Sequence, residues 1–224
     1  MPGDVAWELH GDRAALLCDG LHAVVDVRQP ARGLHDLSLD QRRFADCQFL
    51  GVAIDAEIPA ALADSYTRGG DLIVRYAQTG ARPFGVGVYW RAGVASVGSL
   101  LLPRVDLVVS VETNLLDSRP ELEAQTWLAM PAEASRPANG CLARFPQLGL
   151  SYLELAHPGD ALAPLFTRVG AAVRLTTRLF GQPLERGVIL RSRLRGVFAP
   201  LSASESLAAD ALAQFAAAAP PLTT

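Results

Sequence analysis

The sequence contains no lysine, so all 20 of its basic residues are arginine. A guanidinium keeps its charge and presents a planar fork of donors, which suits contacts with carboxylates, phosphates or sulfates. The formal net charge is nevertheless −3. Because domains that bind nucleic acid in general are basic, the acidic total argues against a nucleic-acid partner.

Cysteine is scarce, and the sequence has no pattern typical of a metal site. Cys18, Cys47 and Cys141 lie far apart without a C-x-x-C pair, and none of the four histidines has ligand spacing to them. We expect buried free thiols in a reducing compartment and no metal. Phosphate-binding G-x-x-x-x-G-K-[ST], H-E-x-x-H and G-x-S-x-G patterns are also missing, and no cofactor is predicted.

Long hydrophobic runs are absent as well. No apolar stretch approaches the length of a membrane span. The first residues, MPGDVAWELHGDR, lack the basic and apolar regions of a signal peptide. The expectation is a soluble, cytoplasmic protein with no membrane partner.

Half of the residues are hydrophobic, and they occur in short alternating segments separated by Gly, Pro, Asp and Asn. Ten segments are predicted as strands: 14–19, 23–28, 48–54, 72–78, 84–91, 105–113, 125–130, 150–155, 172–179 and 188–198. This pattern predicts an all-β fold, a large antiparallel β-sandwich of the supersandwich type, in one domain over 1–224. Strand–helix–strand repetition is missing, which disfavours a Rossmann-like fold. The segment Glu57–Gly70 fits either a helix or a strand.

A single helix is predicted, at about residues 202–218. Ser202 and Glu205 have the spacing of a capping box. A narrow apolar stripe follows and includes Phe215, and two prolines end it at 220–221. We expect the stripe to pack on the sheet or on another subunit.

Arginine is concentrated between residues 172 and 195, AVRLTTRLFGQPLERGVILRSRLR. The alternation predicts a hairpin of two strands around a turn at 181–187. Five arginines would then share one sheet face, because strand side chains alternate between faces: Arg174, Arg178, Arg191, Arg193 and Arg195.

Two interpretations of this arginine face are open. From Arg168 to Arg195 there are seven arginines against one acid, which gives this segment a charge of +6. Because the net charge of the whole chain is −3, the rest of the chain carries −9. The arginines pair with acids elsewhere, with Asp106 and Glu112 as candidates, or they bind an anionic ligand such as a uronate, sulfate or phosphate.

A second cluster lies in the hairpin predicted over 71–91. Arg75, Tyr89 and Arg91 fall on one face, and Trp90 on the other. Aromatic rings stack on the apolar faces of sugars while guanidinium groups bond hydroxyls, so Arg75, Tyr89 and Arg91 are candidate ligand-binding residues. The alternative is an ordinary strand with Trp90 in the core.

Two groups are candidates for acid–base chemistry. Glu112 and Asp117 form a possible carboxylate pair, although Asp117–Pro120 is also a turn sequence. His157 is the preferred catalytic candidate, because Glu154 and Asp160 lie three residues away on either side. His-Pro-Gly-Asp is equally typical of a turn.

Two stretches, DSYTRGGDLIVRYAQT…VYWR (64–91) and LERGVILRSRLRGVF (184–198), resemble an uncharacterised bacterial protein family of unknown function. The many successive strands also resemble the large β-sandwiches of galactose mutarotase-like and carbohydrate-binding proteins. That resemblance implies a sugar-related role, although the histidine motifs of those sugar sites are not recognisable in this chain.

Three functions are compatible with these patterns. The first is binding of a carbohydrate or other anionic small molecule on the arginine–aromatic face. The second is a sugar-processing enzyme of the epimerase, mutarotase or lyase type, with His157 as base. The third is a structural module that forms a homo-oligomer through the helix or a sheet edge.

Overall fold

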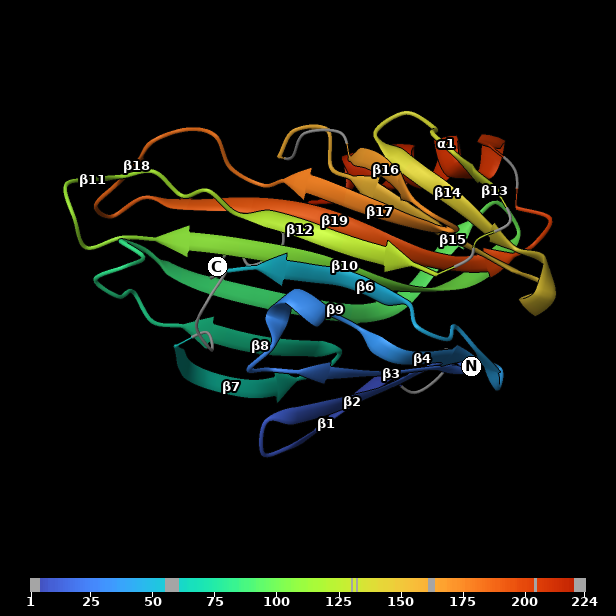
Figure 1. Cartoon of the computed structure of the whole chain (residues 1–224), viewed down its shortest axis with the longest axis horizontal. Coiled ribbons are helices and arrows are strands. Elements are labelled where there is room, and N and C mark those ends of the chain that lie inside the picture. Colours follow the sequence, from blue (N-terminus) through green and yellow to red (C-terminus); the bar gives the residue numbers. More distant parts are fainter. Residues whose placement is uncertain are drawn as a thin grey trace.

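A computed structural model describes residues 5–54, 61–129, 131, 133–160, 164–203 and 205–219. Within these ranges the strands form four antiparallel sheets (Figure 1). The largest has the order β13-β14-β15-β19-β10-β9-β8-β7. Its strands are β7 (Leu62–Arg68), β8 (Asp71–Tyr76), β9 (Gly85–Val97), β10 (Leu100–Glu112), β13 (Glu133–Ser135), β14 (Gly140–Phe145), β15 (Leu150–Ala156) and β19 (Ile189–Pro200).

Three smaller sheets accompany it. The five-stranded sheet contains, in order, β1 (Val5–His10), β2 (Arg13–Cys18), β3 (Leu21–Asp26), β4 (His35–Leu39) and β5 (Arg42–Arg43). The four-stranded sheet contains β16 (Leu165–Val169), β17 (Ala172–Arg178), β12 (Glu123–Leu128) and β6 (Gln48–Ala53). A short pair joins β11 (Asp117–Ser118) to β18 (Leu184–Glu185). Short 3-10 turns span Pro30–Arg32 and Pro146–Leu148, and the helix α1 spans Glu205–Ala217.

This architecture confirms the predicted fold class, an all-β sandwich with a C-terminal helix. Each of the ten predicted strand ranges overlaps a strand of the structure. The ambiguous segment 57–70 contains strand β7, and its first residues, 57–60, lie outside the described part of the chain. The helix begins at Glu205, three residues after the predicted start.

One face of the eight-stranded sheet packs against both the five-stranded and the four-stranded sheets. Its core residues alternate along each strand, as Leu72, Val74 and Tyr76 do on β8. Residues of all three sheets belong to one continuous cluster of buried hydrophobic side chains. Burial of so much apolar surface is the main force that holds the layers together.

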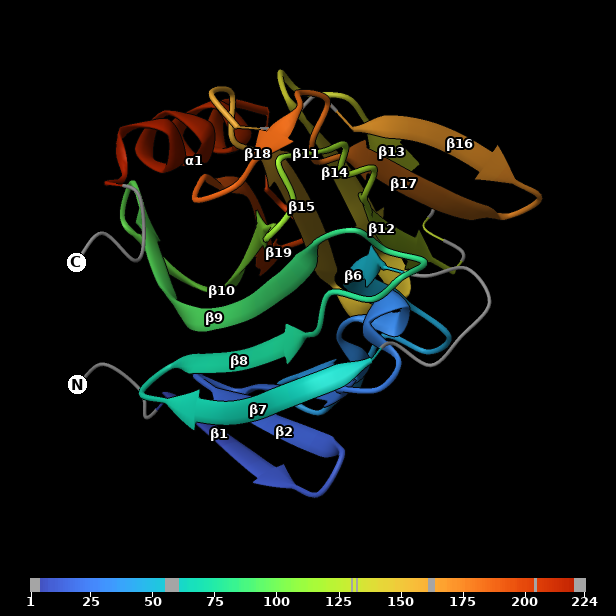
Figure 2. The same cartoon turned by 90° about the vertical axis from the view of Figure 1, so that its left-hand side faces the viewer.

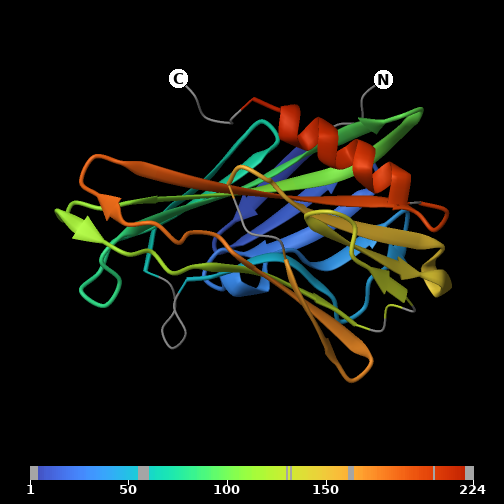
Figure 3. The same ribbon diagram turned by 90° about the horizontal axis from the view of Figure 1, so that it is seen from above.

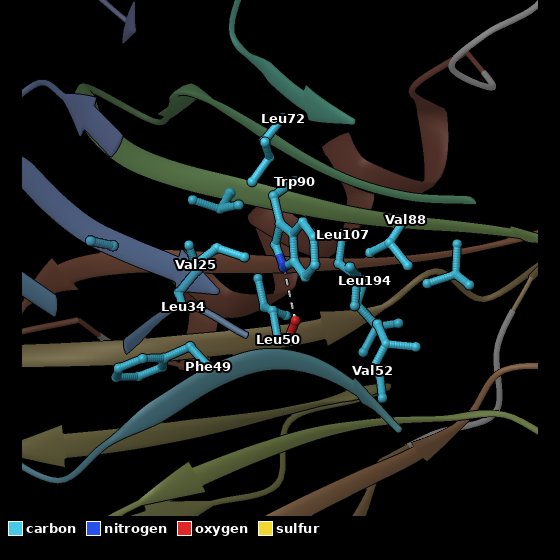
Figure 4. Close-up of a cluster of buried hydrophobic side chains, with 14 of the residues drawn as sticks. Val25, Leu34, Phe49, Leu50, Val52, Leu72, Val88, Trp90, Leu107 and Leu194 are labelled. Atoms are coloured by element: carbon cyan, nitrogen blue, oxygen red, sulfur yellow. Dashed lines mark hydrogen bonds between the residues drawn. The ribbon is translucent and has the colours of Figure 1, made fainter. Parts of the chain in front are cut away.

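Trp90 lies at the centre of this core, as the core interpretation of that residue predicts (Figure 4). Its indole nitrogen donates a hydrogen bond to the carbonyl of Leu50, at 3.0 Å. Leu50 has a φ of +54°, and the pairing of β6 with β12 is irregular at this point. Its amide is held by the hydroxyl of Thr126, at 2.9 Å, so both polar groups of this strained residue are satisfied inside the core.

The opposite face of the eight-stranded sheet is divided into two halves. Helix α1 covers the first half and buries Ala208, Ala211 and Phe215 against apolar residues of β9, β14, β15 and β19. Figure 2 shows β9 and β10 bending around the side on which α1 lies. Figure 3 shows α1 away from the end of the molecule that carries β11 and β18. In the described part of the chain, no helix covers the second half, toward β7 and β8.

Candidate functional site

The uncovered half of the sheet is hollowed into a cavity of about 740 Å³, within the range typical of small-molecule sites. Strands β7, β8, β9, β10 and β19 all contribute to it. Its charged and aromatic lining residues are Tyr66, Arg68, Arg75, Tyr76, Tyr89, Glu112 and Arg191. The cavity thus unites the two arginine clusters that the sequence left apart, through Arg75 and Arg191.

Strand register explains why these two arginines border the same cavity. Arg75 on β8 pairs with Gly87 on β9, Gly87 with Ser110 on β10, and Ser110 with Arg191 on β19. Residues paired directly across a sheet point to the same face. Three steps of about 4.8 Å separate the two backbones, or about 14 Å in all. Between them lie only a glycine and a serine, which form a low floor with an arginine at each side.

Gly87 has a specific steric reason to be glycine. A Cβ at this position would lie 2.7 Å from the Ser110 hydroxyl oxygen and 3.3 Å from the ring of Tyr89. The Tyr89 side chain therefore leans across the floor, into space that any larger residue at 87 would occupy. This places an aromatic ring and a hydroxyl beside the two arginines.

Among the described residues, Arg191 is the arginine of β19 that has no hydrogen-bond or ion-pair partner. Its Nε is buried, and within the described residues it has no hydrogen-bond acceptor. A buried donor without an acceptor costs about 1–3 kcal/mol, and more when it is charged. Arg191 is also one of the residues that line the cavity.

A row further along the same face is fully compensated, and it consists of Asp71, Arg91, Asp106 and Arg195. Arg91 donates to both oxygens of Asp71, at 2.7 and 2.8 Å. Arg195 donates in the same bidentate manner to Asp106, at 2.7 and 3.0 Å, and Arg104 also bonds Asp106. The hydrogen bonds that Arg91 donates to Asp71 raise the pKa of Arg91 above its ordinary value. Arg91 and Arg195 are therefore already paired with carboxylates of the chain, and an anionic ligand would have to displace those carboxylates to bind them.

Arg193 and His157 lie under the helix. Arg193 forms an ion pair with Asp160, and its Nη2 lies 3.3 Å from Nδ1 of His157. Phe215 of α1 packs edge-on against the His157 ring, with centroids 5.2 Å apart. The helix therefore covers this group, which is not among the residues that line the cavity.

The surroundings of His157 disfavour its protonated form and provide a hydrogen bond to its Nδ1. Burial lowers the pKa of His157, and the charge of Asp160 only partly opposes this effect. Its Nδ1 accepts a hydrogen bond from the amide of Gly159, at 3.2 Å. The structure does not bring His157 together with Arg75 or Arg191, which a role as catalytic base at their site requires.

The predicted hairpin over 172–195 is wrong. Strand β17 pairs with β12 and β16 in the four-stranded sheet, whereas β19 pairs with β10 and β15 in the eight-stranded sheet. The segment between them crosses from one sheet to the other and forms β18 on the way. The five arginines consequently do not share a face.

Arg174 and Arg178 accordingly lie on the four-stranded sheet. The Arg174 guanidinium is 5.6 Å from the centre of the Trp127 ring, a cation–π contact. Arg178 donates to the carbonyl of Phe180, at 3.1 Å. Neither residue lines the cavity.

Several lining residues were not among the predicted site residues. Tyr66 and Arg68 are two residues apart on β7 and both line the cavity. Because the sequence of 57–70 fits a helix as well as a strand, their common face could not be predicted. The sequence suggests Glu112 as an acid partner of the arginine face or as half of a carboxylate pair with Asp117, and not as a ligand-binding residue. Glu112 lines the cavity, but Asp117 lies on β11 opposite Glu185.

The described part of the chain contains no group of three or more His, Cys, Asp or Glu side chains placed to hold a metal ion. In the same residues, no helix is long and apolar enough to cross a membrane. The three cysteines are free and buried, as predicted.

The fold and cavity define a supersandwich-like β protein with an open, arginine-lined sheet face. Comparison with protein-family models and with curated proteins finds no match. Among solved structures, the chain is similar to YeaD of Salmonella typhimurium, assigned as a mutarotase, with a TM-score of 0.53 and 8% identity over 88% of this chain and 94% of that one. This likeness concerns the fold alone.

Two other solved structures are similar. A TPR-domain-containing protein from Parabacteroides distasonis has a TM-score of 0.55 and 9% identity over 84% of this chain. The match spans about half, 47%, of that protein's length. A protein from the human microbiome assigned as a kojibiose phosphorylase has a TM-score of 0.40 and 10% identity, over 87% of this chain and 22% of that one. The predicted resemblance to mutarotase-like folds is supported at the level of the fold.

Proposed function

We propose that the protein binds a carbohydrate or another small molecule carrying an anionic group, in the cavity between Arg75 and Arg191. The observation that carries the proposal is Arg191, which lines the cavity and has no hydrogen-bond or ion-pair partner within the described residues, its buried Nε included. Arg75 borders the same cavity from the other side, and in the described part of the chain no hydrogen bond or ion pair occupies it.

The chemistry of the lining fits such a ligand. Guanidinium groups form strong paired hydrogen bonds with carboxylates, sulfates and phosphates. Tyr66 and Tyr89 supply aromatic rings that pack on apolar faces and hydroxyls that bond polar groups. Arginine walls beside aromatic rings favour a charged sugar over a purely apolar molecule.

The test is a binding titration by calorimetry with glucuronate, galacturonate, glucose 6-phosphate and glucose. Arg191→Met and Arg75→Met remove the charge but keep most of the apolar stem. Because a hydrogen bond to a charged group contributes about 1.5–3 kcal/mol, each change should weaken binding about 10- to 150-fold. Arg174→Met, an arginine of the four-stranded sheet outside the cavity, is the matched control and should bind as the wild type does.

Circular dichroism would establish that each variant is folded. If no anionic compound binds at millimolar concentration, or if Arg191→Met and Arg75→Met bind as tightly as the control, the proposal is wrong. Equal affinity for glucose and glucuronate would also contradict the proposal, since the arginines would then make no favourable interaction with the carboxylate.

A second candidate, a sugar-processing enzyme, is favoured by Glu112. Its carboxylate borders the same cavity, whereas His157 does not, so Glu112 is the group available there for acid–base chemistry. Exchange of sugar anomers followed by NMR is the assay. Glu112→Gln should abolish any acceleration while leaving binding nearly unchanged, and a wild type without acceleration would exclude mutarotation.

A further inference from the structure

The cavity changes character along its strands. Two residues beyond the Arg191–Ser110 pair, Ile189 on β19 lies opposite Glu112 on β10. Ile189 is 50% exposed although it is large and apolar, and its neighbour Val188 is also exposed. Both side chains line the cavity. One end of the cavity is therefore charged, and the other is partly apolar.

Two more large apolar residues are exposed close by in the sequence. Leu115 and Leu116 follow the lining residue Asn114, in the segment between β10 and β11. In Figure 3, β11 and β18 lie at the end of the molecule to which this segment leads. Contiguous exposed apolar residues beside a polar cavity are typical of a binding surface, whereas single exposed residues need no explanation.

The rim is held in a defined position. Arg186 donates to the carbonyl of Asn114, at 2.7 Å, and the side chain of Gln78 donates to that of Asn114, also at 2.7 Å. The hydroxyl of Thr113 donates to the carbonyl of Pro83, at 2.8 Å. These bonds join the ends of β8, β10 and β19, so the apolar side chains are presented by a connected frame.

We propose that the ligand of this cavity is an amphiphile. An anionic group lies between Arg75 and Arg191, and an alkyl or aryl substituent lies on Val188 and Ile189. The inference rests on the proposed function, and it adds the class of ligand. Two residues along a strand span about 7 Å, so the two parts of the ligand are separated by about that distance. An alkyl β-D-glucuronide is a probe with both parts, because its carboxylate on C5 and its alkyl group on C1 flank the ring oxygen and, both equatorial, point away from each other.

The test is a series of alkyl β-D-glucuronides, from methyl to hexyl, titrated into the full chain by calorimetry. A fully buried methylene is worth about fourfold in Kd, and on a half-open rim we expect about twofold. The hexyl compound, with five more methylenes, should then bind about 30-fold more tightly than the methyl compound.

Variants separate the two ends of the site. Val188→Ser with Ile189→Ser should abolish the gain with chain length and leave the affinity for methyl glucuronide unchanged. Arg191→Met should weaken every member of the series by a similar factor. Val169→Ser removes an equally exposed apolar residue from β16, in another sheet, and should change nothing.

The outcomes distinguish the two proposals. If methyl glucuronide binds but the affinity does not rise with chain length, the ligand is not an amphiphile, and the proposed function stands. If no glucuronide binds, the proposed function itself is wrong. A neutral hexyl glucoside that binds as tightly as hexyl glucuronide would overturn the amphiphile proposal, because the apolar rim would then act without the arginines.

Discussion

Replacement of Asp106 by asparagine removes the negative charge that two arginines share. Asp106 is buried and accepts the bidentate hydrogen bonds of Arg195, and it also bonds Arg104. The Arg195 guanidinium lies 4.4 Å from the ring centre of Phe215, under the helix, and has little access to water. Asparagine has nearly the same shape, so the change leaves a buried guanidinium without its counter-charge.

Loss of one partner from a buried ion pair typically costs about 3–5 kcal/mol. For a domain of this size that corresponds to a fall in Tm of about 6–20 °C. The control is Asp12→Asn, which breaks an exposed pair with Arg28, joined by one hydrogen bond of 2.6 Å. Exposed pairs contribute about 0–1 kcal/mol, so the control should lose at most about 4 °C.

Urea unfolding followed by tryptophan fluorescence measures both variants. A third variant, Asp106→Asn with Arg195→Met, removes the unpaired charge and should recover part of the lost stability. If Asp106→Asn loses no more than Asp12→Asn, then burial does not strengthen this pair, and the internal compensation of the arginines has little energetic importance.

Three further outcomes are expected. Glu154 is buried, and burial raises its pKa above the ordinary 4.5. The folded state therefore holds this proton more tightly than the unfolded state, so the free energy of unfolding should fall as the pH rises above about 4.5. Unfolding curves measured from about pH 4 to 8 should show this loss in the wild type and not in Glu154→Gln. Phe215→Ala should cost about 3–5 kcal/mol and release α1, detected as faster amide exchange in the helix than in β10. Burial raises the pKa of Cys47 to about 11 and that of Cys141 to about 12, so a thiol reagent at pH 7 should react with them only after denaturant is added, and a rapid native reaction would contradict their burial.

Local pattern was sufficient to predict ten of the strands, but it missed others, such as β1, β4, β14 and β16, and it did not give the partners. The alternation in 72–76 and 84–90 identifies two strands and, through a turn with Gly80 and Pro83, their pairing as β8 and β9. The alternation in 172–179 and 188–198 is equally clear, yet those strands join different sheets. The short connection between 179 and 188 would permit a hairpin. In the structure, β19 instead pairs with β10, which is distant in the sequence, as the pair Ser110 and Arg191 shows.

The candidate site was predictable only in part, for the same reason. Arg75, Tyr89 and Arg191 were identified as residue types suited to an anionic sugar, and they do line one cavity. Arg193 and Arg195 have the same spacing along the same strand, but ion pairs with Asp160 and Asp106 engage them. Which arginine stays unpaired depends on neighbours from other strands and from the helix, which the spacing of arginines along one strand does not reveal.

The position of β19 in the chain has a consequence for synthesis of the protein. This strand lies between β10 and β15, so the two halves of the eight-stranded sheet are joined only after residues 189–200 leave the ribosome. Until then the apolar edges of β10 and β15 are open to other chains. Arg191 arrives on the same strand. A nascent or truncated chain therefore exposes edges that can aggregate and has no complete cavity, so completion of the fold and formation of the candidate site are one event.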